Sequence, residues 1–320
     1  MAGIIKRKII RPVRNAIVYW FFRSIFFFTK ILPRKPILAW HGALALFVFN
    51  FFRNSRKVIL QQLNLVFGEE FTPKEIYKMG QDVFVNLGKT FTDFARFSNF
   101  TTREQFSKYF TFEGEEHLKK AYEKGKGVLC LTIHTSGWEF SAIMPPVLGY
   151  KTAGVSQNIK NSALNDYMIQ LREKRGMKNI TKKNSYEKLI NVLSAGECLI
   201  IMIDQDSKNN RGDFLKFFGR DAYTPLGCAR LAMETGAVVV PMATFRNSDN
   251  TYVFQILPEI PFKSTGNIDY DLHHNTQIYN DVIESLIREH ITQWVWLHKR
   301  WDTTPKKLKE YLEKRTKNKK

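Results

Sequence analysis

Five short apolar segments constrain the fold of this chain more than any other feature. They occupy residues 127–133, 151–156, 197–203, 237–243 and 252–258. Segments of this length and composition indicate strands that are covered on both faces. The stretches at 74–98, 138–148, 162–176, 185–195 and 225–235 are predicted to be helices, the first with TPKE as its start signal. Strands and helices in alternation predict an α/β fold, with helices on the faces of one sheet.

The charge of the chain is high and unevenly distributed. Its 320 residues carry a formal net charge of +19, which predicts an anionic partner such as nucleic acid, an anionic membrane or a phosphorylated substrate. No Asp or Glu occurs between Met1 and Gly68, whereas Lys and Arg recur throughout and flank apolar runs at 15–33 and 37–52.

Residues 1–60 are predicted to attach the protein to a membrane. Neither apolar run offers the ~20 uninterrupted apolar residues of a spanning helix, and Arg23 interrupts the first. No small-residue cleavage site follows that run, so a removed signal peptide is not indicated. Aromatic and basic side chains without acids are typical of helices at an anionic interface. Spanning and lying on the bilayer both stay open, and a buried helical hairpin is the alternative to attachment.

The rest of the chain is predicted to contain one domain at 61–305 and a basic tail at 306–320, of which 314–320 are expected to be disordered. The three cysteines lie in apolar or helical context, and none belongs to a CxxC pair: Cys130, Cys198 and Cys228. They are interpreted as small buried hydrophobic residues in a reducing compartment. No metal site is predicted.

A histidine follows the first apolar segment, in the stretch GVLCLTIHTSGWEF. His134 is predicted to lie at the carboxyl end of a strand, where open α/β sheets place their ligands. Glu139 falls in the first turns of the next helix, from which its carboxylate can point back to the imidazole. Such a carboxylate fixes the ring tautomer and leaves the other nitrogen as a general base. No GxSxG motif is present, so activation of an acceptor hydroxyl fits better than a covalent acyl-enzyme. A structural histidine is the alternative.

Three polar residues follow the strand predicted at 197–203. Asp204, Gln205 and Asp206 are expected at the same sheet edge as His134. They are interpreted as a polar wall of an acceptor site or as a partner of the histidine pair. A turn and helix cap is the alternative.

The stretch at 209–220 contains glycine and basic residues, as a phosphate-contacting loop does. Arg211 and Arg220 are its candidate ligands, because a guanidinium binds phosphate bidentately. A solvated basic surface is the alternative. Near the C-terminus, three tryptophans are compatible with a core or with a membrane-facing or acyl-binding surface, and His298 is interpreted as structural.

Four segments together resemble motifs of the bacterial lipid A biosynthesis acyltransferases, the late or secondary lauroyl and myristoyl transferases. They are GVLCLTIHTSGWEF (127–140), ECLIIMIDQD (197–206), the stretch 214–246 and QWVWLHKRWDTTP (293–305). They occur in the order of the family's motifs, and the resemblance covers nearly the whole chain. The TSGW that follows His134 differs from the FGNW-like sequence common in the family, which leaves the fit of the acceptor open.

The resemblance implies a glycerolipid acyltransferase-like fold with a mixed, mostly parallel sheet. It implies transfer of a fatty acyl chain from a thioester, on acyl carrier protein or coenzyme A, to a hydroxyl of a lipid A precursor. His134 would be the base and Glu139 the residue that orients it. Backbone N–H groups after His134 would bind the oxyanion, and Arg172 and Arg175 would be further substrate-binding candidates.

The implied setting is the cytoplasmic face of the bacterial inner membrane. The implied partners are acyl carrier protein, anionic membrane lipid and the lipid A precursor, with no nucleic acid, no cofactor and no metal. The protein is expected to be a monomer or a weak oligomer. Two other functions stay open: the same chemistry on another glycolipid or aminolipid, and a non-enzymatic basic membrane- or nucleic-acid-binding protein. No helix-turn-helix, zinc-finger or RNA-binding aromatic motif supports nucleic acid.

Overall fold

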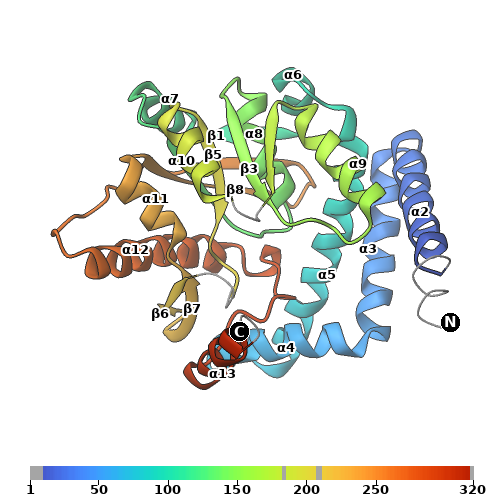
Figure 1. Ribbon diagram of the computed structural model, residues 1–320. Coiled ribbons are helices and arrows are strands. Elements are labelled where there is room, and N and C mark those ends of the chain that lie inside the picture. Colours follow the sequence, from blue (N-terminus) through green and yellow to red (C-terminus); the bar gives the residue numbers. More distant parts are fainter. Residues whose placement is uncertain (1–9, 182–184, 207–210, 318–320) are drawn as a thin grey trace.

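The computed structural model describes residues 10–181, 185–206 and 211–317. A seven-stranded sheet with the order β1-β9-β8-β2-β5-β3-β4 lies at its centre (Figure 1). All neighbouring strands are parallel except β8 and β9, so the mixed, mostly parallel sheet is confirmed. The strands are β1 (Phe110–Glu113), β2 (Val128–Thr132), β3 (Thr152–Ser156), β4 (Met177–Thr181), β5 (Cys198–Met202), β8 (Val238–Arg246) and β9 (Tyr252–Ile256).

Helices cover both faces of this sheet, as the alternating pattern predicts. Side chains of successive strand residues point to opposite faces: Leu129 and Leu131 enter a core with α10, α11 and α12, whereas Cys130 and Ile200 enter a second core with α7, α8 and α9. The helices are α7 (Glu115–Glu123), α8 (Trp138–Val147), α9 (Ser162–Glu173), α10 (Tyr186–Ser194), α11 (Gly227–Thr235) and α12 (Ile268–Glu289). Shorter helical segments are α6 (Arg103–Ser107), η2 (Phe97–Asn99) and η3 (Ile291–Gln293).

Two predictions about local structure are wrong. The expected phosphate-contacting loop is largely an antiparallel hairpin of β6 (Gly212–Phe217) and β7 (Arg220–Pro225), because its alternating residues bury Leu215 and Phe217 on one face; residues 207–210 lie outside the described residues. Of the tail expected to be disordered, residues 314–317 belong to α13 (Pro305–Lys317), and residues 318–320 lie outside the described residues. Apolar residues at helical spacing there, Leu308, Tyr311 and Leu312, give the tail one amphipathic face.

Four helices precede the sheet: α2 (Arg11–Ile31), α3 (Arg34–Phe51), α4 (Arg53–Phe67) and α5 (Pro73–Arg96). Helix α5 begins at the predicted TPKE signal, where Thr72 and Glu75 form a capping box. Helix α3 packs closely along α5, since a Cβ at Gly88 would lie 2.7 Å from the Cβ of Ala45.

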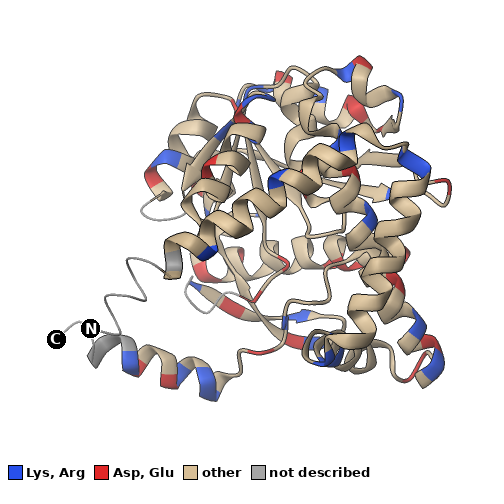
Figure 2. Ribbon diagram, turned by 90° about the vertical axis from the view of Figure 1, so that its right-hand side faces the viewer, with Lys and Arg blue, Asp and Glu red and all other residues tan. Residues whose placement is uncertain are grey.

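The outward side of α2 and α3 is rich in exposed apolar side chains. Figure 2 faces this side of the molecule and shows Lys and Arg on the helices there. Large apolar residues that are more than one third exposed include Val13, Ile17, Trp20, Phe21, Phe27, Phe28, Ile31, Trp40, Leu44, Phe47 and Phe51. In the part of the chain described, no helix by itself has the length and apolarity to cross a bilayer; α3 and α4 meet that test only as a pair bent by 90°.

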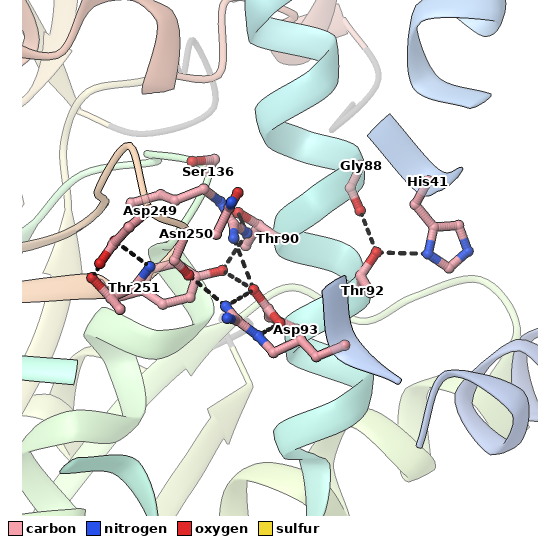
Figure 3. Close-up of polar contacts among 12 residues, drawn as sticks. His41, Gly88, Thr90, Thr92, Asp93, Ser136, Asp249, Asn250 and Thr251 are labelled. Atoms are coloured by element: carbon pink, nitrogen blue, oxygen red, sulfur yellow. Dashed lines mark hydrogen bonds and ion pairs between the residues drawn. The ribbon is translucent and has the colours of Figure 1, made fainter. Parts of the chain in front are cut away.

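A buried ionic cluster fastens these helices to the sheet (Figure 3). The carboxylate of Asp93, in α5, is fully buried and lies 2.8 Å from Nε of Arg34 and 2.8 Å from Nη1 of Arg246. The Tyr252 hydroxyl donates a further hydrogen bond to it at 2.9 Å. Because Arg34 opens α3 and Arg246 ends β8, the cluster joins the N-terminal layer to the strand that neighbours β2.

Candidate active site

His134 and Asp204 meet at the carboxyl edge of the sheet. Strands β2 and β5 are parallel neighbours in which Thr132 pairs with Met202. Each of the two site residues lies two positions beyond that pair, so strand pairing alone brings them side by side. Nδ1 of His134 lies 2.7 Å from Oδ1 of Asp204, and the backbone N–H of His134 donates to Oδ2 at 2.8 Å.

Asp204 is fully buried and ionised. Burial by itself would raise the pKa of Asp204, but the charge of His134 and hydrogen bonds from the His134 ring, the Trp294 indole N–H and the His134 backbone lower that pKa from 3.8 to about 2. An ionised carboxylate only accepts hydrogen bonds, so Nδ1 of His134 carries the proton. The other ring nitrogen, Nε2, is then available as a general base.

Glu139 does not occupy the position expected for it. Its carboxylate binds Arg172 through two hydrogen bonds, Nε to Oε2 at 3.0 Å and Nη2 to Oε1 at 2.5 Å. Burial acts against the charge of Arg172, yet Glu139 raises the pKa of that guanidinium above its ordinary value. The pairing of His134 with Glu139 is therefore corrected to a pairing with Asp204. The physical reason is that the guanidinium of Arg172, in α9, binds the carboxylate of Glu139 bidentately. The register of β2 and β5 instead places Asp204 beside the imidazole.

A C-terminal segment closes the edge of the sheet behind the pair. The N–H of Val295 donates to the carbonyl of His134 at 2.8 Å, and the N–H of Ser136 donates to the carbonyl of Gln293 at 2.5 Å. Trp294 and Trp296 are buried in the core and Trp301 packs against it. The core interpretation of these tryptophans is confirmed, and the first of them contributes the indole N–H on Asp204.

A cavity of about 900 Å³ lies against His134, within the size range of small-molecule sites. It extends to both faces of the sheet, because Ile200 and Ile201, which point to opposite faces, both line it. We name its two parts the α8 lobe and the α11 lobe. The α8 lobe is lined by Glu139, Ala142, Gly154, Arg172, Met177 and Ile200. The α11 lobe is lined by Tyr186, Leu189, Ile201, Leu226, Cys228 and Leu231.

Of the predicted polar wall, Gln205 and Asp206 line the cavity together with Arg211. The Asp206 carboxylate accepts hydrogen bonds from the N–H and hydroxyl of Thr303, at 2.6 and 2.7 Å. Asp206 therefore also holds the C-terminal segment against the end of β5. Arg211 is exposed and lies 3.5 Å from Asp269.

Two predicted arginines do not line the cavity. Arg220 is exposed at the turn between β6 and β7. Arg175 is buried and donates to the backbone carbonyls of Phe97, Phe100 and Leu171. Burial lowers the pKa of Arg175 to about 10. This geometry does not support a ligand role for either residue. Of the two arginines predicted near the end of α9, Arg172 lines the cavity and Arg175 does not.

Sequence reasoning missed several residues that line the cavity. Arg230, which is half-buried, the exposed Lys299 and the buried Met177 all belong to its lining. One signal was available for the α8 lobe: Gly154 interrupts a buried strand, as happens where something must approach the backbone closely. A Cβ at Gly154 would come within 3.0 Å of the sulfur of Met177.

Comparisons with known proteins agree with this geometry. The sequence profile described as bacterial lipid A biosynthesis acyltransferase matches residues 5–303. The palmitoleoyltransferase of lipid A biosynthesis from Escherichia coli (strain K12) is 24% identical over 295 residues, which cover 89% of this chain and 91% of the relative. The lauroyltransferase of the same strain is 23% identical over 288 residues, covering 89% and 92%.

A relative that matches a shorter part of this chain is named for another lipid. The phosphatidylinositol mannoside acyltransferase of Mycolicibacterium smegmatis is 24% identical over 190 residues, covering 58% of this chain and 60% of the relative. The profile match spans nearly the whole chain and includes the strand ends that carry His134 and Asp204. The protein belongs to the bacterial lipid A biosynthesis acyltransferase family.

Proposed function

We propose that the protein transfers a fatty acyl chain from the thioester of acyl carrier protein to a hydroxyl of a lipid A precursor, at the cytoplasmic face of the inner membrane. One observation supports this most: His134 lines a large, mainly apolar cavity while its Nδ1 is bound to the buried carboxylate of Asp204. This is the arrangement of a general base whose proton acceptor faces a ligand.

The proposed reaction needs no covalent enzyme intermediate. Nε2 of His134 takes the proton of the acceptor hydroxyl as its oxygen attacks the thioester carbonyl carbon. A C–O bond forms, a tetrahedral oxyanion results, and its collapse breaks the C–S bond. The imidazolium then returns the proton to the departing sulfur, which leaves as a free thiol. The ionised Asp204 stabilises the imidazolium between the two proton transfers.

The two lobes suit the two substrates. The α8 lobe is lined by the buried residues Ala142, Ile200 and Met177, and we assign the donor chain to it. The rim of the α11 lobe carries Arg211, Arg230 and Lys299. Cationic side chains bind phosphate, so we assign the phosphorylated acceptor to this lobe.

The exposed apolar residues of α2 and α3 support attachment to a membrane. They form one face with basic residues among them and no acids, as helices that lie in a lipid interface do. An interfacial position would give the enzyme access to a lipid acceptor.

A mass-spectrometric transfer assay tests the proposal. The protein in detergent is incubated with acyl carrier protein thioester and a tetra-acylated lipid A precursor, with His134→Ala in parallel. We expect the precursor to gain one acyl chain with the wild type and none with the variant. A gain with both proteins would refute His134 as the base. No gain with either would refute this pair of substrates.

A second acceptor belongs in the same assay because one relative is a phosphatidylinositol mannoside acyltransferase. Phosphatidylinositol mannoside is therefore supplied alone and in competition with the lipid A precursor. Preferred acylation of the mannoside would replace the proposed acceptor while leaving the proposed chemistry intact.

A further inference from the structure

The oxyanion of the proposed reaction requires hydrogen-bond donors. The backbone N–H groups after His134, which were predicted to supply them, already have other partners. The N–H groups of the four residues that follow His134 are engaged within the protein. Those of Thr135 and Trp138 donate to the carbonyls of Ile133 and Thr135, at 2.8 and 3.2 Å. Those of Ser136 and Gly137 donate to the carbonyl of Gln293 and to the hydroxyl of Thr135, at 2.5 and 3.2 Å. These four groups are therefore not free to bind an oxyanion beside His134, and a donor on another wall of the cavity can take their place.

His298 stands on such a wall. Its ring centroid lies 5.5 Å from that of His134, with the two planes inclined by 61°. The side chain is half-buried and lines the cavity. Within the described part of the chain its ring nitrogens have no hydrogen-bond partner, whereas Nδ1 of His134 is fixed on Asp204. The ring of His134 is thus held by Asp204, whereas the ring of His298 is free to contact a ligand.

The backbone on both sides of His298 is held in place. The side-chain amide of Gln62, in α4, donates to the carbonyls of Trp296 and His298, the first at 2.9 Å. The same amide oxygen accepts the N–H of Arg300 at 2.8 Å. Arg300 is fully buried and donates to the carbonyl of Tyr223 and the hydroxyl of Thr224. A donor presented by so constrained a segment is preorganised, which is the property that makes oxyanion binding effective.

The charge around His298 favours a neutral ring. Burial lowers the pKa of His298, and the charge of His134 lowers it further, although Asp204 acts in the opposite direction. A neutral imidazole carries one N–H, so it can donate a hydrogen bond to an oxygen without competing with His134 for the substrate proton.

We propose that His298 is a second catalytic residue, whose ring N–H donates a hydrogen bond to the thioester carbonyl oxygen as that oxygen becomes an oxyanion. The inference rests on the proposed acyl transfer and adds a role to it. His134 removes the hydroxyl proton on one side of the carbonyl carbon, and His298 stabilises the negative charge on its oxygen. His298 exchanges no proton with the substrate, so the bonds formed and broken are those of the proposed reaction.

Thiol release from the acyl thioester tests this inference separately from the choice of acceptor. The released thiol is quantified with a thiol reagent, first with the lipid A precursor and then with water as the acceptor. Removal of one oxyanion donor typically costs 10²–10³ in rate. For His298→Phe we expect kcat to fall by roughly 30- to 300-fold with both acceptors, while KM for the thioester stays within about threefold. His298→Gln, which keeps an N–H donor, should recover about tenfold of that loss.

The matched control is His274→Phe. His274 lies in α12, stacks on Tyr270 and does not line the cavity, so its replacement should leave kcat unchanged. Thermal midpoints of all variants separate a catalytic effect from misfolding. Unchanged kcat in His298→Phe, or equal losses in the Phe and Gln variants with a lowered midpoint, would overturn the inference. Thiol release by the wild type without acylation of the lipid would refute the acceptor alone. The absence of any thiol release would refute the acyl transfer and the role of His298 with it.

Discussion

Asp204→Asn should abolish most of the catalytic rate while preserving the fold. The substitution keeps the shape of the side chain and one carbonyl oxygen. At the place of Oδ2 this oxygen can still accept both the indole N–H of Trp294 and the backbone N–H of His134. The substitution removes the negative charge 2.7 Å from the imidazole. It also allows an amide N–H to face Nδ1, which favours the tautomer with its proton on Nε2 and so blocks the base.

The size of the effect follows from the titration of Asp204. Its pKa lies at about 2 instead of 3.8, and each unit corresponds to about 1.4 kcal/mol. All contacts of the ionised carboxylate together therefore stabilise it by about 2 to 3 kcal/mol, net of its burial. Loss of that stabilisation in the transition state alone lowers kcat on the order of 10²-fold. The wrong tautomer adds to this loss, and a comparable substitution in a Ser-His-Asp triad costs about 10⁴.

The same shift predicts how stability depends on pH. Because the pKa of Asp204 is lower in the folded protein than in the unfolded chain, its contribution is fully present above about pH 4 and is lost as the pH falls through about 2. The free energies of unfolding of wild type and Asp204→Asn, measured by chemical denaturation, should therefore differ by about 2 to 3 kcal/mol at pH 7 and converge toward pH 2.

The control is a surface pair of the same type. His273 and Asp213 lie 2.7 Å apart, but both side chains are about half exposed. Asp213→Asn should leave kcat and stability unchanged, since exposed ion pairs contribute little. If Asp204→Asn kept kcat within threefold of the wild type while Glu139→Gln lost it, the pairing seen here would not be the one that operates in catalysis.

Three further substitutions test other parts of the structure. Arg172→Met leaves the carboxylate of Glu139 unpaired and should lower the free energy of unfolding by about 3 kcal/mol, and adding Glu139→Gln should restore part of that loss in a denaturation experiment. Met177→Ala removes three heavy atoms from the lining of the α8 lobe, so the preferred acyl donor should lengthen by about two to three methylene groups. A competition among thioesters of different chain length, analysed by mass spectrometry, checks this. A longer preferred chain in Leu231→Ala, and not in Met177→Ala, would assign the donor chain to the α11 lobe instead. Trp20→Glu combined with Phe28→Glu replaces side chains that are 66% and 59% exposed; sedimentation with anionic vesicles should fall at least about tenfold with no change in thermal midpoint, and undiminished binding would contradict an interfacial role for α2.

The sequence predicts most of the fold, because its strands are continuous apolar runs and its helices have clear spacing. All five predicted strands are present, with ends displaced by up to three residues. Strands β1 and β4 escaped prediction because each has exposed polar positions at an edge of the sheet. The hairpin of β6 and β7 escaped because its glycine and basic residues favoured a loop.

The site was predicted to the correct edge of the sheet but with the wrong acidic partner. His134 and Asp204 both end predicted strands, so their proximity could be inferred once those two strands were known to be neighbours. Neighbouring strands in the sheet are not neighbours in sequence here, since β3 and β4 lie between β2 and β5 along the chain. The partner of Glu139 comes from α9, and no spacing within one segment reports such a contact.

The Arg34–Asp93–Arg246 cluster bears on how the protein can be modified. Deletion of α2 and α3 would leave Asp93 with one guanidinium instead of two and would strip the cover from the apolar side of α5. The N-terminal layer is thus an integral part of the folded unit, and truncation is the wrong way to obtain a form that is easy to handle in water. Replacing the outward apolar side chains one by one should lower the proposed lipid affinity and leave the cluster, and the strand end beside it, undisturbed.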